Sequence, residues 1–132
     1  MENLFNSITE ILILLFLMIT FLQSGIDKIT DWKGNVSWLK DHFSQTYLKN
    51  VIPISLAKLL ILEVIIGVLC IVGIYKIIAE NNTTYALYAT ILSCIVLLAL
   101  LFGQRIAKDY DGARTIVIYF MPAIFGVYLL SN

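Results

Sequence analysis

The fold of this chain is decided by residues 53–78, PISLAKLLILEVIIGVLCIVGIYKII, an apolar stretch interrupted by few charges. The stretch exceeds the ~20 apolar residues that a helix needs to cross the ~30 Å hydrocarbon core of a bilayer. Three further apolar segments of similar length lie at about 4–26, 85–106 and 114–130. Because a bilayer offers no water to unpaired backbone groups, each of the four segments is expected to be a transmembrane helix.

The composition of the whole chain supports the same class of protein. Of the 132 residues, 60% are hydrophobic and 14% are charged, whereas a soluble domain has about 45–50% apolar and about 25% charged residues. A chain this small cannot cover so much apolar surface, which excludes a water-soluble monomer. Nine basic and nine acidic residues cancel, so nothing in the charge indicates a nucleic-acid partner. We therefore expect an all-α integral membrane four-helix bundle, a single domain over residues 1–132. Its expected partners are the lipid bilayer and either other membrane proteins or further copies of the chain.

The distribution of basic residues predicts the orientation of the bundle. The segments between the first and second helices and between the third and fourth contain seven basic residues: Lys28, Lys33, Lys40, Lys49, Arg105, Lys108 and Arg114. The opposite side has only Lys76. Basic residues concentrate in cytoplasmic loops of membrane proteins. Both termini and the turn at 81–84 are therefore expected on the exterior or periplasmic side.

The long connector between the first two membrane helices is predicted to contain an amphipathic helix over about 37–49. Ser37 can cap such a helix, and Leu39, Phe43 and Tyr47 recur at i, i+4 and i+8 on one face. The polar residues of the segment fall on the other face: Lys40, Asp41, Ser44 and Gln45. We expect this helix to lie on the cytoplasmic membrane surface or to fold under the bundle. His42 and Trp38 are candidate contacts at this interface, and His42 could instead donate a hydrogen bond to a quinone carbonyl.

Glu63 is the residue of the second membrane helix that demands a partner. A charged side chain inside the bilayer costs at least ~2.5 kcal/mol on insertion scales, so it should face the bundle interior or a cavity. Residues of the other helices at a similar depth are expected to join it in a polar cluster: Gln23, Ser24, Lys28, Gln104, Arg105 and Tyr119. Two interpretations remain open. The cluster is either a site for a quinone, a proton or a small polar ligand, or a polar lock that holds the helices together.

Metal and haem chemistry have no motif in this sequence. Cys70 and Cys94 both lie in apolar runs, without a C-x-x-C spacing, and His42 is the only histidine. No metal ligand set is therefore predicted, and no cofactor is required, although a quinone would suit the polar cluster. The two cysteines lie at similar depth on neighbouring helices, where a disulfide and a pair of buried free thiols are the alternatives.

The order of short motifs along the four helices resembles the DoxX-like family of small four-helix bacterial membrane proteins. The motifs are FLQSGIDK at 21–28, AKLL at 57–60 followed by Glu63, Gly67 and Gly73, and FGQRIAKDY at 102–110 followed by Gly112-Ala113, which looks like a Bacteroidetes-type signature. One function that the resemblance implies is that of a small accessory subunit of the bacterial inner membrane, linked to a quinone within an oxidoreductase complex. The alternative is a non-enzymatic helical scaffold that packs against partner membrane proteins.

Overall fold

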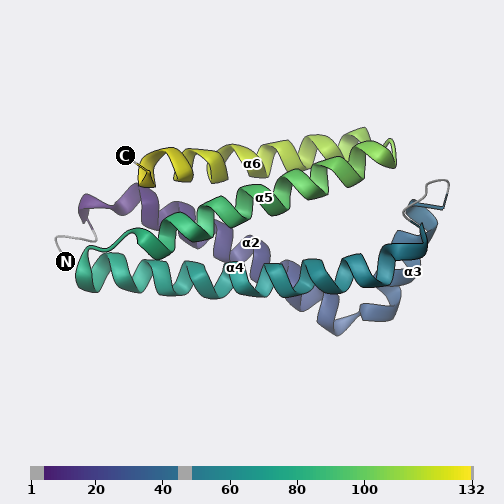
Figure 1. The fold of residues 1–132 in the computed structure, drawn as a ribbon, viewed down its shortest axis with the longest axis horizontal. Coiled ribbons are helices and arrows are strands. Elements are labelled where there is room, and N and C mark those ends of the chain that lie inside the picture. Colours follow the sequence, from purple (N-terminus) through teal and green to yellow (C-terminus); the bar gives the residue numbers. More distant parts are fainter. Residues whose placement is uncertain (1–4, 45–48, 132) are drawn as a thin grey trace.

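The computed structural model describes residues 5–44 and 49–131, which are all-α, with no strand in these ranges (Figure 1). Its helices are α2 (Ile8–Thr30), α3 (Trp32–His42), the short 3-10 helix η1 (Lys49–Val51), α4 (Ile52–Glu80), α5 (Thr84–Ile106) and α6 (Tyr110–Leu130). Four of these, α2, α4, α5 and α6, are long and apolar enough to cross a membrane. The expected fold class, a membrane four-helix bundle with a further helix between the first two spans, is confirmed.

Three of the membrane helices extend past at least one of their predicted ends, whereas α5 keeps its predicted bounds to within one residue and α2 begins at Ile8, later than its predicted start. The helix α2 continues to Thr30 and α4 to Glu80, while α6 already begins at Tyr110. Hydropathy marks where apolar side chains stop, but backbone hydrogen bonding carries a helix on into water until a capping or turn residue ends it. The residue that marks the start of α6 is Asp109, whose Oδ1 accepts a hydrogen bond from the Gly112 amide at 3.0 Å.

The bundle has its connections at two opposite ends. The helix α2 packs against α4, α4 against α5, and α5 against α6. The start of α2 and the end of α6 lie at the same end as the α4–α5 turn, whereas α3 and the α5–α6 turn lie at the other (Figure 1). In the same view α4 and α5 are close together near their connecting turn and diverge toward α3.

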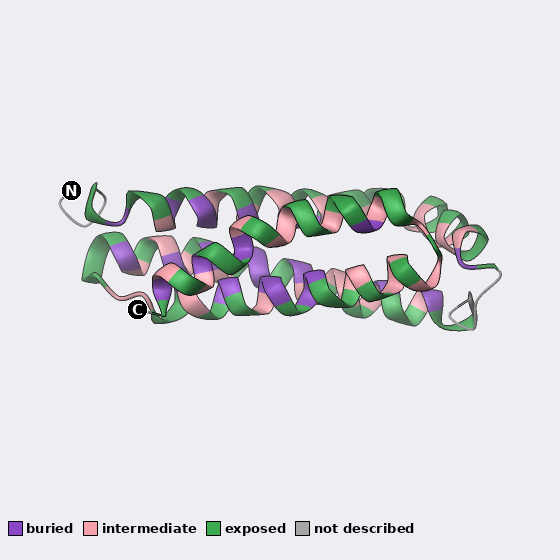
Figure 2. Cartoon of the chain, turned by 90° about the horizontal axis from the view of Figure 1, so that it is seen from above, coloured by how far each residue is buried: buried purple, intermediate pink, exposed green. Residues whose placement is uncertain are grey.

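Buried residues lie on the inward faces of the four long helices, and exposed residues run along their outward faces (Figure 2). The helices α4 and α5 approach closely at Gly73 and Ala86, where a Cβ added to the glycine would lie 2.9 Å from the Ala86 Cα. Small residues at helix contacts let backbones approach closely, as is usual in membrane bundles. The α4–α5 pair is therefore joined backbone to backbone near its turn.

The helix between the first two spans differs from its predicted bounds. It begins at Trp32 rather than Ser37, because the Asp31 side chain accepts from the Gly34 amide at 3.3 Å and caps the helix there. Ser37 lies exposed inside α3, and the helix ends at His42. Of the predicted apolar stripe, Leu39 is half-buried and Phe43 is buried. Gln45 and Tyr47 lie outside the described residues. The helix packs against α2 and α4, which is the arrangement under the bundle.

Candidate functional site

A buried ion pair joins α2 to α4 near the middle of the bundle. The Nζ atom of Lys28 lies 2.7 Å from Oε1 of Glu63, and the two side chains are 12% and 2% exposed. Lys28 Nζ also donates to the Ser24 hydroxyl at 2.7 Å. The ion pair is the polar contact of Glu63 Oε1, since no described donor reaches this oxygen in hydrogen-bond geometry. The buried carboxylate therefore depends on one cation for its compensation.

The position of Lys28 follows from the periodicity of α2. Lys28 stands in the last turn of α2, four residues after Ser24, so both side chains lie on the same helix face. A lysine near a helix end can lay its apolar stem along the helix and place its ammonium some distance away. Here the ammonium reaches inward to the level of Glu63, as the sequence predicted for Lys28 or Arg105.

A cavity of about 450 Å³, here the α3 cavity, lies between α2, α3, α4 and α5 at the end where the helices diverge. Its wall is mainly apolar, with Leu39, Phe43, Leu56, Leu59, Leu100 and Phe102 among the lining residues. Its polar lining residues are Lys28, Asn35, Ser55 and Gln104, together with the indole of Trp38. The α3 cavity thus combines an apolar body with a few polar groups, as small-molecule sites do.

A second cavity of about 460 Å³, here the α6 cavity, lies between α2, α4, α5 and α6. Glu63 lines it, and so do the polar residues Thr20, Gln23, Ser24, Asp27 and Tyr119. Lys28 lines the α3 cavity, Glu63 lines the α6 cavity, and Leu100 lines both. The ion pair therefore stands between two cavities, with its cation facing one and its anion facing the other.

His42 links α3 to the α5–α6 turn. Its Nε2 atom lies 3.3 Å from Oδ2 of Asp109 and 3.4 Å from Oε1 of Gln104, and its ring stacks on Trp38 with centroids 4.7 Å apart. His42 lines neither of the two cavities, whereas Trp38 and Gln104 line the α3 cavity. His42 accordingly positions Trp38 and Gln104, which face the α3 cavity, while its own ring contacts Trp38, Gln104 and Asp109.

The structure brings most of the predicted polar cluster together. Ser24, Lys28 and Glu63 are in contact, Gln23 and Tyr119 share the α6 cavity with Glu63, and Gln104 faces Lys28's cavity. Arg105 does not join them. It is exposed, and its guanidinium lies 5.2 Å from the ring centre of Tyr110. Successive helical residues are about 100° apart, so α5 turns Arg105 away from the face that carries Gln104.

Five polar residues of this region were not among the predicted site residues: Thr20, Asp27, Asn35, Ser55 and Asp109. The signal for Asp27 is its spacing, since it lies four residues after Gln23 and three after Ser24 on one face of α2. Asn35 and Asp109 reach the region through α3 and the α5–α6 turn, whose placement has no counterpart in local sequence. Cys70 and Cys94 are buried free thiols, which decides against the disulfide.

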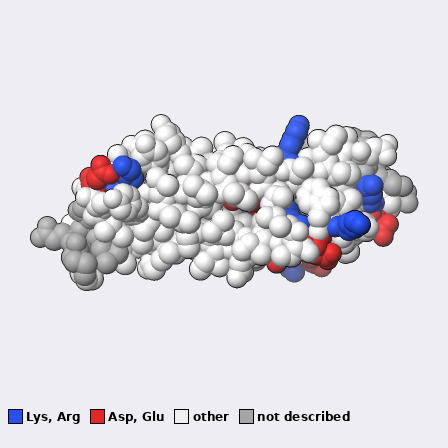
Figure 3. All heavy atoms as spheres, turned by 90° about the horizontal axis from the view of Figure 1, so that it is seen from below, with Lys and Arg blue, Asp and Glu red and all other residues white. Residues whose placement is uncertain are grey.

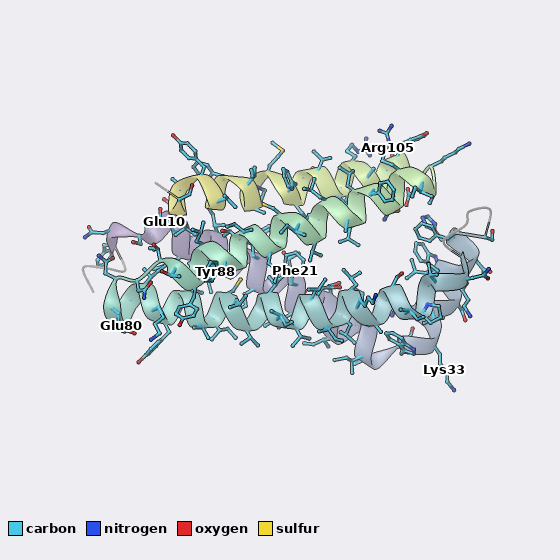
Figure 4. The ribbon with its side chains drawn as sticks, viewed as in Figure 1. Glu10, Phe21, Lys33, Glu80, Tyr88 and Arg105 are labelled. Atoms are coloured by element: carbon cyan, nitrogen blue, oxygen red, sulfur yellow. The ribbon has the colours of Figure 1, made fainter. Side chains whose placement is uncertain are left out.

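Charged side chains gather mainly toward the two ends of the molecule, with a wide uncharged band between them (Figure 3). Glu10 and Glu80 lie at the end with the α4–α5 turn, and Lys33 and Arg105 lie toward the α3 end (Figure 4). This polarity of charge is what a chain that spans a membrane presents.

In searches of protein-family models, curated proteins and solved structures, nothing matches this chain.

Proposed function

We propose that this chain is a small membrane subunit that binds the polar head of a lipid-soluble, quinone-type molecule in the α3 cavity. The observation that supports the proposal is the ammonium of Lys28, held by a buried carboxylate and lining a largely apolar cavity. Removing a charge from water is costly, and two apolar residues in place of Lys28 and Glu63 would not carry this cost. A cation placed at such a wall can donate to an uncharged carbonyl oxygen.

The dimensions and chemistry of the α3 cavity fit a quinone head. Its volume of about 450 Å³ falls within the roughly 300–1,000 Å³ of small-molecule sites. Trp38 and Phe43 offer ring faces or edges to a planar ring, and Lys28 and Gln104 offer N–H donors. A quinone carries carbonyl oxygens on opposite sides of its ring, and when bound it supplies a carrier for two electrons and two protons. The residues of this chain would bind and orient that head.

The remaining expectations are part of the same proposal. The resemblance to the DoxX-like family suggests a bacterial inner-membrane subunit that works within an oxidoreductase complex. The basic residues near α3, against the acidic residues at the other end, support a cytoplasmic α3 and periplasmic termini. In this arrangement the α3 cavity lies in the cytoplasmic half of the membrane.

The test is a titration of the purified chain in lipid nanodiscs with decylubiquinone. The chain has two tryptophans, so a Trp32→Phe background leaves Trp38 as the fluorescent reporter in the cavity wall. We expect saturable quenching. In Lys28→Met/Glu63→Leu, which removes both charges together, affinity should fall roughly tenfold or more, the equivalent of a charged hydrogen bond.

The matched control is Lys33→Met, which removes an exposed lysine of α3 that lines neither cavity. Its affinity should equal that of the parent chain. Quenching that rises linearly with quinone and is the same in all three variants would reflect partition into lipid. That result would overturn the proposal and favour the scaffold alternative, in which the chain only packs against partner membrane proteins.

A further inference from the structure

We infer that Glu63 exchanges a proton with water through the α6 cavity, and that ligand binding beside Lys28 is coupled to proton uptake at Glu63. The coupling rests on the proposed function, whereas the proton exchange rests on the geometry of the α6 cavity alone. The observation that carries both is the placement of one ion pair between two separate cavities.

The α6 cavity has a polar wall that leads to the carboxylate. Thr20, Gln23, Ser24 and Asp27 stand at i, i+3, i+4 and i+7 of α2, which is one face of a helix. Asp27 is exposed and lies three residues before the end of α2, on the side of the bundle where α3 follows. The cavity of about 460 Å³ has room for several waters, since each occupies about 30 Å³ and needs two to four polar partners.

The titratable groups that face Glu63 come from α2 and α6. Lys28 and Asp27 face the site from α2, and Tyr119 faces it from α6. The α5 residues at this cavity, Leu97 and Leu100, are apolar. Lys58, on α4 itself, is exposed and lines neither cavity. Lys28 is thus the described cation that lies within ion-pair distance of Glu63.

Coupling follows from competition for the Lys28 ammonium. Its N–H groups are directed at Glu63 and at Ser24 in the structure. A carbonyl oxygen in the α3 cavity that accepts one of these bonds weakens the ion pair. The less compensated carboxylate then takes a proton from hydronium in the α6 cavity, which forms one O–H bond, leaves water and moves no electron. By linkage, ligand binding must tighten as pH falls.

The first experiment needs no ligand. Infrared spectra of the chain in nanodiscs are recorded during acidification, and the carbonyl stretch of a protonated carboxylic acid is assigned to Glu63 by its loss in Glu63→Gln. We expect this band to shift within the mixing time when D₂O replaces H₂O. In Gln23→Leu, which removes one polar group from the middle of the α2 wall of the α6 cavity, the shift should be at least tenfold slower. Ile19→Leu, an apolar change at the same cavity, is the matched control.

The second experiment measures proton uptake with a pH indicator when decylubiquinone is added in weak buffer. We expect up to about one proton per bound ligand in the parent chain and none per bound ligand in Glu63→Gln, whose bound fraction is measured by the quenching of Trp38. Saturable binding without uptake would overturn the coupling and leave the proposed function standing. A Glu63 band that does not exchange in D₂O, or that exchanges equally fast in Gln23→Leu, would overturn the proton route whether or not a quinone binds.

Discussion

At the scale of single residues, the Lys28–Glu63 pair carries the cost of removing two charges from water, and this cost can be tested with variants. Its two charges come from different helices, and both are largely removed from water. Breaking a buried pair by removing one partner typically costs 3–5 kcal/mol, whereas replacing both by apolar residues is often neutral. The pair therefore has a characteristic pattern of single and double variants.

We predict that Lys28→Met and Glu63→Leu each lower the free energy of unfolding by about 3–5 kcal/mol, and that the double variant regains most of the loss. The measurement is reversible unfolding in mixed detergent micelles. The matched control is the exposed pair of Lys76 and Glu80, 2.6 Å apart within α4, for which the same three changes should have little effect. Additive losses in the Lys28 and Glu63 variants would contradict the buried pair.

The sequence predicted Glu63 as the centre of the site, because a lone carboxylate in an apolar helix must find compensation. It left the cation open between Lys28 and Arg105, since both side chains are long enough to reach the level of Glu63 from helix ends. The choice depends on how α5 is rotated relative to α2 and α4. That rotation is set by packing between helices and not by any local pattern.

At the scale of elements, α3 shows what a capping motif decides. Ser37 fits a cap, but Asp31 lies earlier and has glycine three residues later, so its carboxylate meets an unobstructed amide. Asp109 and Gly112 repeat this arrangement at α6, where a Cβ on the glycine would lie 2.5 Å from a carboxylate oxygen. The helices α3 and α6 therefore start after Asp31 and Asp109, and α3 begins five residues before its predicted start at Ser37.

We predict that His42→Phe loosens α3 without unfolding the bundle. Phenylalanine retains a ring to stack on Trp38 but loses the contacts of Nε2 with Asp109 and Gln104. A spin label at the exposed Lys40 should become more mobile, while the unfolding midpoint changes little. Asp41→Asn alters an exposed side chain of the same helix and is the control. Unchanged label mobility in His42→Phe would show that the histidine does not fasten α3.

At the scale of the whole molecule, the asymmetry of charge predicts a topology that can be measured. Single cysteines at Asn82 and at Asp111, in a Cys70→Ala/Cys94→Ala background, stand at opposite ends of the bundle. In spheroplasts, an impermeant thiol reagent should label the Asn82→Cys chain and spare the Asp111→Cys chain until the membrane is opened. Labelling of Asp111→Cys alone would invert the orientation and move the α3 cavity to the outer half of the membrane.

The architecture of the bundle was predictable from sequence because segment length and apolar content suffice to specify membrane helices. The two cavities were not. Their walls come from four helices each, so their shapes depend on how those helices pack together. Gln104 and Tyr119 were expected in one cluster on grounds of depth, yet they line different cavities. Depth along a helix is a local property, while the side of a neighbouring helix on which a residue lies is a property of the assembly.

The contact of Gly73 with the Ala86 backbone has a mechanical consequence. At this position the space beside the Gly73 Cα is filled by the Ala86 backbone and its methyl group, so the two helices cannot come closer there. If α4 tilts slightly against α5 about this contact, the displacement grows with distance along the helices and is largest at their far ends. The leverage falls on the α3 end, where the walls of the α3 cavity are made. A change in the angle between α4 and α5 would therefore alter the α3 cavity more than the contact at Gly73.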